Sequence, residues 1–159
     1  MTPIVKTLDV PLTPQDAFDL FTKQIGRWWP VDSHSISAGS GTLPQDLTLE
    51  PKQGGKIIET DTKGDPHPWG HITHWSEGAR VDINWYVGRD VSQATQISVT
   101  FTPIDTGTRV DLTHSGFAAH GETARASHDS YDMGWDHVLG QRFLQQCRIV
   151  LSHAALDTY

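Results

Sequence analysis

Between residues 47 and 114 the chain repeatedly alternates apolar and polar side chains, with short turns between one alternating segment and the next. In the clearest segment, residues 80–88, every second side chain is apolar, among them Ile83 and Trp85. Alternation of this kind is typical of strands that bury one face only. Because tight turns join successive segments, the pattern predicts an antiparallel meander and not a series of βαβ units.

The two ends of the chain follow a different periodicity. From residue 130 onward apolar residues recur every three or four positions, which predicts one helix of roughly 25 residues or more. Near the N-terminus, residues 4–10 have the composition of a first strand. Thr13 followed by Pro14 is a typical helix start, and Gly26 then separates this helix from a second short helix or turn.

Together these elements predict one α+β domain over residues 1–159: a curved antiparallel sheet of about six to seven strands, with two short helices after the first strand and a long C-terminal helix. One face of the sheet needs covering, and the terminal helix is the only predicted element large enough to do so. Where a long helix lies in a curved sheet, a gap can hold a ligand. Two weakly periodic segments, residues 31–45 and 116–128, are expected to be loops that gate this cavity.

Charge and composition exclude several classes of partner. The chain carries 12 basic and 19 acidic residues, a net charge of −7, and has no basic run, so we expect neither nucleic-acid binding nor membrane insertion. No signal peptide is recognisable, and no stretch reaches the roughly 20 apolar residues of a membrane span. Cys147 is the single cysteine, which excludes an internal disulfide. We therefore expect a cytoplasmic protein.

Four patches of sequence resemble one known family. They are Ile25-Gly26-Arg27-Trp28-Trp29-Pro30, then Gly70 to Trp75 together with Ile83-Asn84-Trp85, then Phe101 to Phe117, and finally Gly134-Trp135 with Val138-Leu139. In order and spacing they resemble the START-like or Bet v 1-like (SRPBCC) superfamily, and within it the bacterial Aha1-like family of Hsp90 ATPase activator homologues. The resemblance covers nearly the whole chain and implies the helix-grip fold. Since it includes only one domain of the eukaryotic activator, it does not by itself imply a chaperone role.

The candidate ligand-binding residues are bulky or polar side chains that the pattern assigns to the inner surface: Trp28, Trp29, His71, Trp75, Trp85, Phe101, Leu112, His114, Trp135, Leu139 and Phe143. Core packing explains any one tryptophan. Five indoles, however, are bulky for a core without gaps, and their N–H groups need partners. His114 shares a face with Leu112, so it is either a core histidine bonded to a hydroxyl or carbonyl, or a group that orients a ligand or moves a proton.

Metal-binding and catalytic patterns are weak. His67, His71 and His74 form the densest histidine cluster, but residues three apart on a strand point to opposite faces, and residues four apart lie about 13 Å from each other. We therefore predict no metal and no cofactor. Cys147 lies within an apolar helical stripe, where a thiol is usually inert, and no P-loop or nucleophile elbow is present. No residue is predicted to be catalytic.

Three functions remain open. The first is the binding of a small apolar or aromatic molecule between sheet and helix, with the apolar walls giving affinity and His114, aided by His71 or an indole N–H, giving orientation. The second, implied by superfamily relatives, is a cyclase- or aromatase-like enzyme that transfers a proton in a bound ligand. The third is a protein-interaction role similar to that of the chaperone co-factor, on the outer face of the sheet. The sequence specifies neither a protein partner nor a homodimer.

Overall fold

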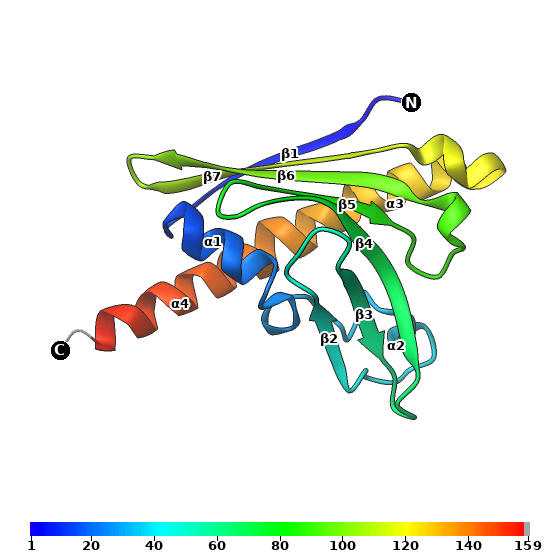
Figure 1. The fold of residues 1–159 in the computed structure, drawn as a ribbon, viewed down its shortest axis with the longest axis horizontal. Helices are drawn as coiled ribbons and strands as arrows, with labels where there is room; N and C mark the ends of the chain where they lie inside the picture. Colours follow the sequence, from blue (N-terminus) through cyan, green and yellow to red (C-terminus); the bar gives the residue numbers. More distant parts are fainter. Residues whose placement is uncertain (158–159) are drawn as a thin grey trace.

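The computed structural model describes the backbone of residues 1–157 and the side chains of residues 1–154. Its centre is a curled, seven-stranded antiparallel sheet in the order β1-β7-β6-β5-β4-β3-β2. The strands are β1 Ile4–Val10, β2 Asp46–Leu49, β3 Lys56–Thr60, β4 Pro66–Ser76, β5 Arg80–Trp85, β6 Thr95–Ile104 and β7 Gly107–Ser115. Strands β4, β3 and β2 bend away from strands β1, β7 and β6 (Figure 1). The predicted α+β meander is confirmed.

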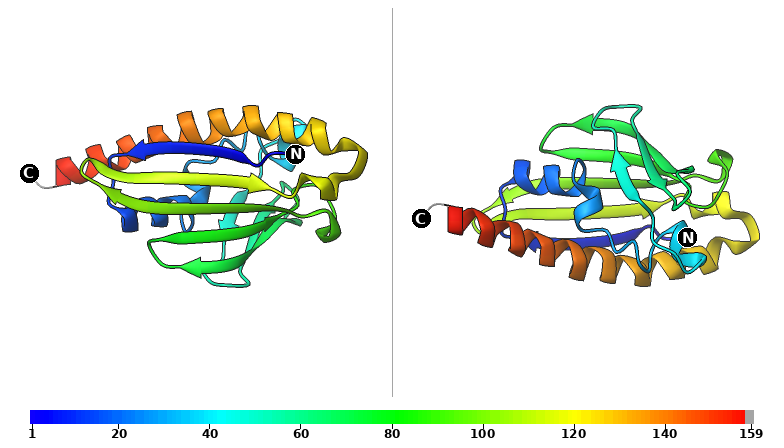
Figure 2. Two further views of the ribbon diagram at one scale, coloured as in Figure 1. Left: turned by 90° about the horizontal axis from the view of Figure 1, so that it is seen from above. Right: turned by 90° about the horizontal axis from the view of Figure 1, so that it is seen from below.

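The C-terminal helix runs lengthwise along this sheet and contacts β1 (Figure 2). It consists of α3 Ala124–His137, a π-helical segment η4 Val138–Phe143, and α4 Leu144–Asp157, in unbroken succession. The predicted long helix is therefore confirmed, although it begins before residue 130. Its early start was not visible in the sequence because only Ala124 and Trp135 of α3 are buried, too few to produce an apolar stripe.

The π-helical segment η4 adjusts which side chains of the long helix face the sheet. Its hydrogen bonds span five residues instead of four, so side chains five apart come to lie on the same side. Val138 and Phe143 are five apart, and both are buried, as is Leu139. The widened turn therefore directs three bulky residues into the interior.

The first helix follows its sequence signals. Helix α1 Pro14–Phe21 begins after Thr13, whose hydroxyl accepts a hydrogen bond from the Asp16 N–H at 3.2 Å, and Pro14 occupies its first turn. This arrangement satisfies an amide that the helix itself leaves without a partner. The buried face of α1 includes Phe18 and Phe21. The second predicted short helix is a single 3-10 turn, η1 Ile25–Arg27.

Both segments expected to be loops contain helical structure, so these two predictions are corrected. Residues 31–45 include the short helix α2 Ile36–Gly39, and residues 116–128 include the 3-10 helix η3 Phe117–Thr123 and the start of α3. A third short turn, η2 Val91–Gln93, joins β5 to β6. Such short helices bury too few apolar residues to show a periodic pattern in the sequence.

Two glycines of the family-like motifs are explained by close backbone contacts. A Cβ atom added at Gly26 would lie 2.7 Å from the carbonyl oxygen of Leu47, and one at Gly70 would lie 2.3 Å from that of Asn84. Neither distance is compatible with a side chain. Glycine therefore allows η1 to approach β2, and β4 to approach β5.

One half of the interior is a tightly packed group of aromatic rings, which we call the packed end: Phe18, Phe21, Trp28, Phe101 and Phe143. Ring centroids lie 4.9 Å apart for Trp28 and Phe143, 5.5 Å for Phe21 and Phe143, and 5.3 Å for Phe18 and Phe101. These are the separations of interlocked edge-to-face pairs. The packed end therefore has no room for a ligand.

Candidate ligand-binding site

A cavity of about 390 Å³ lies at the opposite end of the interior, and we call this region the open end. It is bounded by the segment after η1, by β4 and β5, by the turn that follows β5, and by α3. The lining residues are Trp29, Ser33, His34, Ser35, Ile36, Trp69, Trp85, Val87, Gly88, Ser130 and Tyr131. Its lining is largely apolar, with hydroxyl and imidazole groups among it, which is the usual composition of a small-molecule site.

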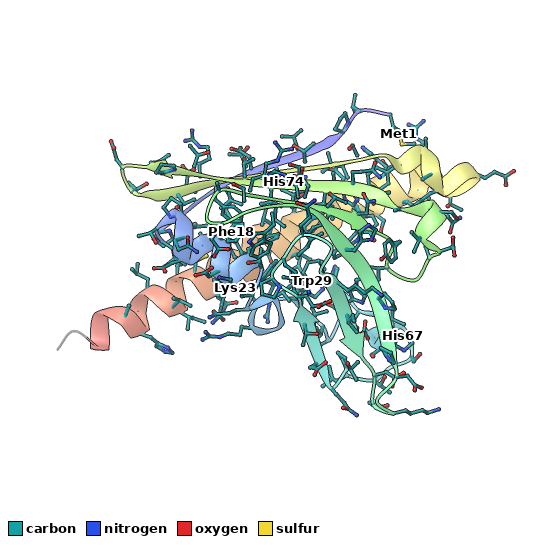
Figure 3. The ribbon with its side chains drawn as sticks, in the orientation of Figure 1. Met1, Phe18, Lys23, Trp29, His67 and His74 are labelled. Carbon is teal, nitrogen blue, oxygen red and sulfur yellow. The ribbon has the colours of Figure 1, made fainter. Side chains whose placement is uncertain are left out.

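Three tryptophans form the innermost wall of the cavity. The rings of Trp29 and Trp69 are 5.2 Å apart, and each lies 5.6 Å from the ring of Trp85. In Figure 3 Trp29 is labelled near the middle of the molecule, and Phe18 of the packed end is labelled on α1. The rings are tilted or edge-on to one another, so they pack as one aromatic cluster on this side of the cavity.

Every indole N–H in this wall already has a partner in the protein. Trp29 donates to the His34 carbonyl oxygen at 2.7 Å, Trp69 to the Glu59 carboxylate at 2.9 Å, and Trp85 to the Tyr131 hydroxyl oxygen at 3.1 Å. An indole has no second hydrogen-bonding group. These tryptophans can therefore offer a ligand only apolar and π contacts, and ligand orientation has to come from other residues.

Glu59 is a fully buried carboxylate behind the cavity wall. Besides the Trp69 indole, it accepts hydrogen bonds from the backbone N–H of Ile36 at 2.9 Å and of Ser37 at 2.8 Å, and from the Ser37 hydroxyl. Burial on its own raises the pKa of Glu59, but these hydrogen bonds together outweigh burial and lower its pKa below the usual value. The ionised carboxylate thus holds α2 and Trp69 in place around the cavity.

His114 is completely buried beside the cavity and does not line it. Its Nδ1 accepts a hydrogen bond from the Trp135 indole at 3.0 Å, and since an indole only donates, the ring proton must sit on Nε2. Nε2 then donates to the Thr95 hydroxyl at 2.7 Å. Burial, with His120 and His128 nearby, lowers the pKa of His114 to about 3. His114 is therefore a neutral histidine with both nitrogens bonded inside the protein.

His34 is the titratable imidazole that does line the cavity. Its Nδ1 lies 2.7 Å from the Ser33 hydroxyl, and its ring stacks on that of His137 in α3 with centroids 5.4 Å apart. Burial and the proximity of His137 lower the pKa of His34, while Asp32 opposes them. The ring is therefore mainly neutral at pH 7, a state in which an imidazole can accept a proton.

Comparison with protein families decides which family the chain represents. The profile of the family described as activator of Hsp90 ATPase homolog 1-like protein matches residues 11–146. The chain belongs to this family. This match confirms the resemblance to the Aha1-like family that the sequence motifs indicated. A search of curated proteins finds no significant match.

Several solved structures share the fold of this Aha1-like protein. Protein MLL2253 from Mesorhizobium loti is 15% identical, with a TM-score of 0.65 over 96% of this chain and 98% of that one. The AHSA1-like protein from Aeromonas hydrophila is 13% identical, with a TM-score of 0.64 over 94% of each chain. The anthrahydroquino-γ-pyrone synthase Txn09, complexed with SUM, is 30% identical, with a TM-score of 0.57 over 83% of this chain and 88% of that one.

Two residues predicted to bind a ligand, Trp29 and Trp85, line the cavity of the Aha1-like chain. Four others lie elsewhere in the buried core: Trp28, Phe101 and Phe143 at the packed end, and Leu112 on the inner face of β7. The remaining apolar candidates are Leu139, which is buried in η4, and Trp135, which is buried and bonded to His114.

The last two predicted residues lie away from the cavity. Trp75 packs edge-on against Phe18 at 4.8 Å and donates its N–H to Glu77 at 2.8 Å. His71 pairs across the sheet with Asn84, which points away from the interior between the buried residues of β5. The Nδ1 of His71 lies 3.1 Å from the hydroxyl of Tyr86.

A β-bulge corrects one prediction about the histidines of β4. His71 lies opposite Asn84 and His74 opposite Asp82, and the register shifts between Ile72 and His74. The bulge inserts one extra residue, so His71 and His74 lie on the same outer face and do not point to opposite faces. Within the described part of the chain, no three His, Cys, Asp or Glu residues form a group able to hold a metal ion.

Among the residues of the site that the sequence did not reveal are Glu59, Trp69, Tyr131 and His34. One signal could have revealed Glu59, because it lies two residues after the buried Ile57 and therefore shares its inward face. Trp69 follows Pro68 at a register shift of β3 against β4, where simple alternation fails. His34 lies in a segment without a clear apolar period, whereas Tyr131 lies four residues before Trp135 on the same side of the predicted helix, a spacing that could have revealed it.

None of the described helices combines enough length with enough apolar character to cross a membrane.

Proposed function

We propose that this Aha1-like protein binds a small, flat aromatic molecule in the cavity at the open end. The observation that carries the proposal is the cavity of about 390 Å³ with the three indoles Trp29, Trp69 and Trp85 in its wall. Cavities of roughly 300–1,000 Å³ are typical of small-molecule sites. Because the three N–H groups are already bonded, the wall favours ligands that bind through ring surfaces.

The arrangement around this wall supports a stable binding site. Glu59 joins α2 to Trp69, so one side of the cavity and part of its wall are held by the same carboxylate. Trp29 donates to the backbone of His34, which ties the intervening segment to the wall as well. A site held in shape before binding loses less entropy when its ligand enters.

Binding can be tested with fluorene, a flat apolar tricyclic hydrocarbon. Thermal unfolding is followed by circular dichroism with and without fluorene, and at about ten times the dissociation constant we expect the midpoint to rise by about 3–6 °C. Ser130→Trp places a bulky ring on an exposed helix position that lines the cavity, so the rise should disappear. Met133→Trp is the matched control, since Met133 is 75% exposed on the same helix and does not line the cavity.

Two outcomes would contradict binding at this site. An unchanged unfolding midpoint of the unaltered protein in fluorene would argue against aromatic binding. Equal stabilisation of the Ser130→Trp and Met133→Trp proteins would place the bound molecule outside the cavity.

A second candidate function is a cyclase-like reaction on the bound molecule. It is favoured by the 30% identity to Txn09, described as an anthrahydroquino-γ-pyrone synthase, and by the His34 imidazole in the cavity wall. A neutral imidazole beside a bound ketone can remove a proton from the adjacent carbon, which is the step that precedes ring closure through an enolate.

This alternative has its own probe, the α-proton exchange of 1-tetralone in deuterium oxide, followed by NMR. A general base contributes about 10²–10⁴-fold to such a transfer, so exchange catalysed by the protein should fall by that factor in His34→Ala. Retained stabilisation of the His34→Ala protein by fluorene would show that its cavity is intact. Exchange no faster than in buffer would argue for a binding protein without this catalysis.

A further inference from the structure

Tyr131 is a cavity residue whose hydrogen bonding is incomplete within the described part of the protein. It belongs to α3, and its ring is held edge-on to His114 at 4.8 Å and tilted against Phe117 at 5.9 Å. These contacts fix the phenol ring in the cavity wall, beside Trp85. The position of its hydroxyl oxygen is therefore determined by packing and does not depend on a ligand.

The Tyr131 hydroxyl still has one hydrogen-bond donor to offer. The Trp85 indole can only donate, so at 3.1 Å the Tyr131 oxygen is the acceptor of that bond. The hydroxyl hydrogen of Tyr131 then needs an acceptor of its own. His114 cannot supply one, because its Nδ1 and Nε2 are bonded to Trp135 and Thr95. No other described residue accepts a hydrogen bond from Tyr131.

The hydroxyl also keeps its hydrogen at physiological pH. Burial raises the pKa of Tyr131 above its usual value, and the opposing effects of the Trp85 hydrogen bond and of Arg89 are smaller. The phenol is therefore neutral and presents one hydrogen-bond donor next to an aromatic surface.

We infer that the Tyr131 hydroxyl donates a hydrogen bond to a carbonyl oxygen of the ligand, so that the site selects flat aromatic ketones or quinones over the corresponding hydrocarbons. A neutral acceptor fits better than a carboxylate, because the described residues that line the cavity include no lysine or arginine. An amine would lack an acceptor at this point of the wall. This inference rests on the proposed function and specifies the chemical class of its ligand.

The test compares fluorenone with fluorene, which share the same three-ring skeleton and differ by the ketone oxygen. Dissociation constants are measured by equilibrium dialysis against the intact protein. One additional hydrogen bond in a partly buried site is expected to make fluorenone bind about tenfold more tightly than fluorene. Tyr131→Phe removes this hydrogen bond, and without any donor at this point the ratio of the two constants should approach one.

The ratio serves as its own control for changes in cavity shape. Tyr131→Phe also frees the Trp85 N–H, which can then donate to the ketone oxygen, so the ratio is measured as well in the Tyr131→Phe/Trp85→Phe protein, where both donors are removed. A second measurement needs no variant: the infrared C=O stretch of protein-bound fluorenone should lie at lower wavenumber than that of fluorenone in hexane, because the carbonyl accepts a hydrogen bond.

The outcomes distinguish this inference from the function on which it rests. If fluorene and fluorenone bind the unaltered protein equally, or if the preference persists in the Tyr131→Phe/Trp85→Phe protein, the role of the hydroxyl is overturned while aromatic binding stands. An unshifted C=O stretch would mean that the bound carbonyl accepts no hydrogen bond, and it would overturn the role of the Tyr131 hydroxyl as well. If neither compound binds, both the proposed function and this inference are overturned.

Discussion

The packed end and the open end are built from the same kind of side chain, yet one is filled and the other is hollow. Rings at the packed end approach to 4.9–5.9 Å, and those of the three indoles at the open end to 5.2–5.6 Å. What differs is the element opposite. At the packed end Phe143 of η4 inserts among rings from α1 and the sheet, whereas at the open end the facing residues include Ser33, Ser35 and Ser130. Small residues opposite an aromatic wall leave the space in which a ligand can bind.

Two neighbouring residues show how local this difference is. Trp28 is 1% exposed, donates its N–H to the Leu20 carbonyl oxygen at 3.0 Å and packs on Phe143. Trp29, the next residue, faces the cavity. Adjacent indoles of one motif thus serve core and site separately, and residue type alone does not distinguish them.

The largest effect is expected from a truncation at the packed end. Phe143→Ala removes a completely buried ring that contacts both Phe21 and Trp28, and should lower the free energy of unfolding by about 3–5 kcal/mol. Urea denaturation measures this loss. A cost below about 1 kcal/mol would mean that the packed end is loosely filled, and the contrast between the two ends would fail.

Acidification is expected to have a smaller effect on stability. Because His114 is buried next to the open end, lowering the pH from 7 to 5 should reduce the free energy of unfolding by about 2 kcal/mol. The unfolded chain binds a proton on this histidine below about pH 6.5, whereas the folded protein does so only near its pKa of about 3. The stabilisation is therefore complete above pH 6.5 and is lost as pH falls toward 3.

His114→Gln, which cannot titrate, provides the comparison for this pH dependence. Between pH 7 and pH 5 the unaltered protein should lose about 2 kcal/mol more unfolding free energy than His114→Gln. Urea denaturation at the two pH values gives both losses. Equal losses would mean that His114 can take up a proton in the folded state, and hence that it is accessible from the cavity.

The smallest effect is expected from adding volume at the open end. Val87 lines the cavity and is partly exposed, so Val87→Phe can place its larger ring in empty space and should change the unfolding free energy by less than about 0.5 kcal/mol. Cys147→Phe is the matched change at a completely buried position of α4, where overpacking should cost about 1–3 kcal/mol. Similar costs at both positions would remove the distinction between a filled and a hollow end.

Much of the architecture could be predicted from the sequence because its signals are periodic and local. Alternation in β5 and β7, the Thr13–Pro14 helix start and the apolar stripe through Leu139 and Phe143 all repeat within a few residues. The site was less predictable, since its residues depend on irregularities of the chain. The bulges at Ile57–Ile58 and Ile72–His74 change which residues face inward, and the π-helical turn changes which helix residues do.

The sequence by itself determined the class of fold, the order of its elements and the family, because strand and helix periodicities and the motif glycines act through neighbouring residues. The tertiary structure alone decided which aromatic residues are core and which surround the cavity. That division depends on what lies opposite each ring: Phe143 for Trp28, but serines, His34 and Tyr131 around the cavity that Trp29 faces. Such pairings join distant segments, and no local pattern in the chain encodes them.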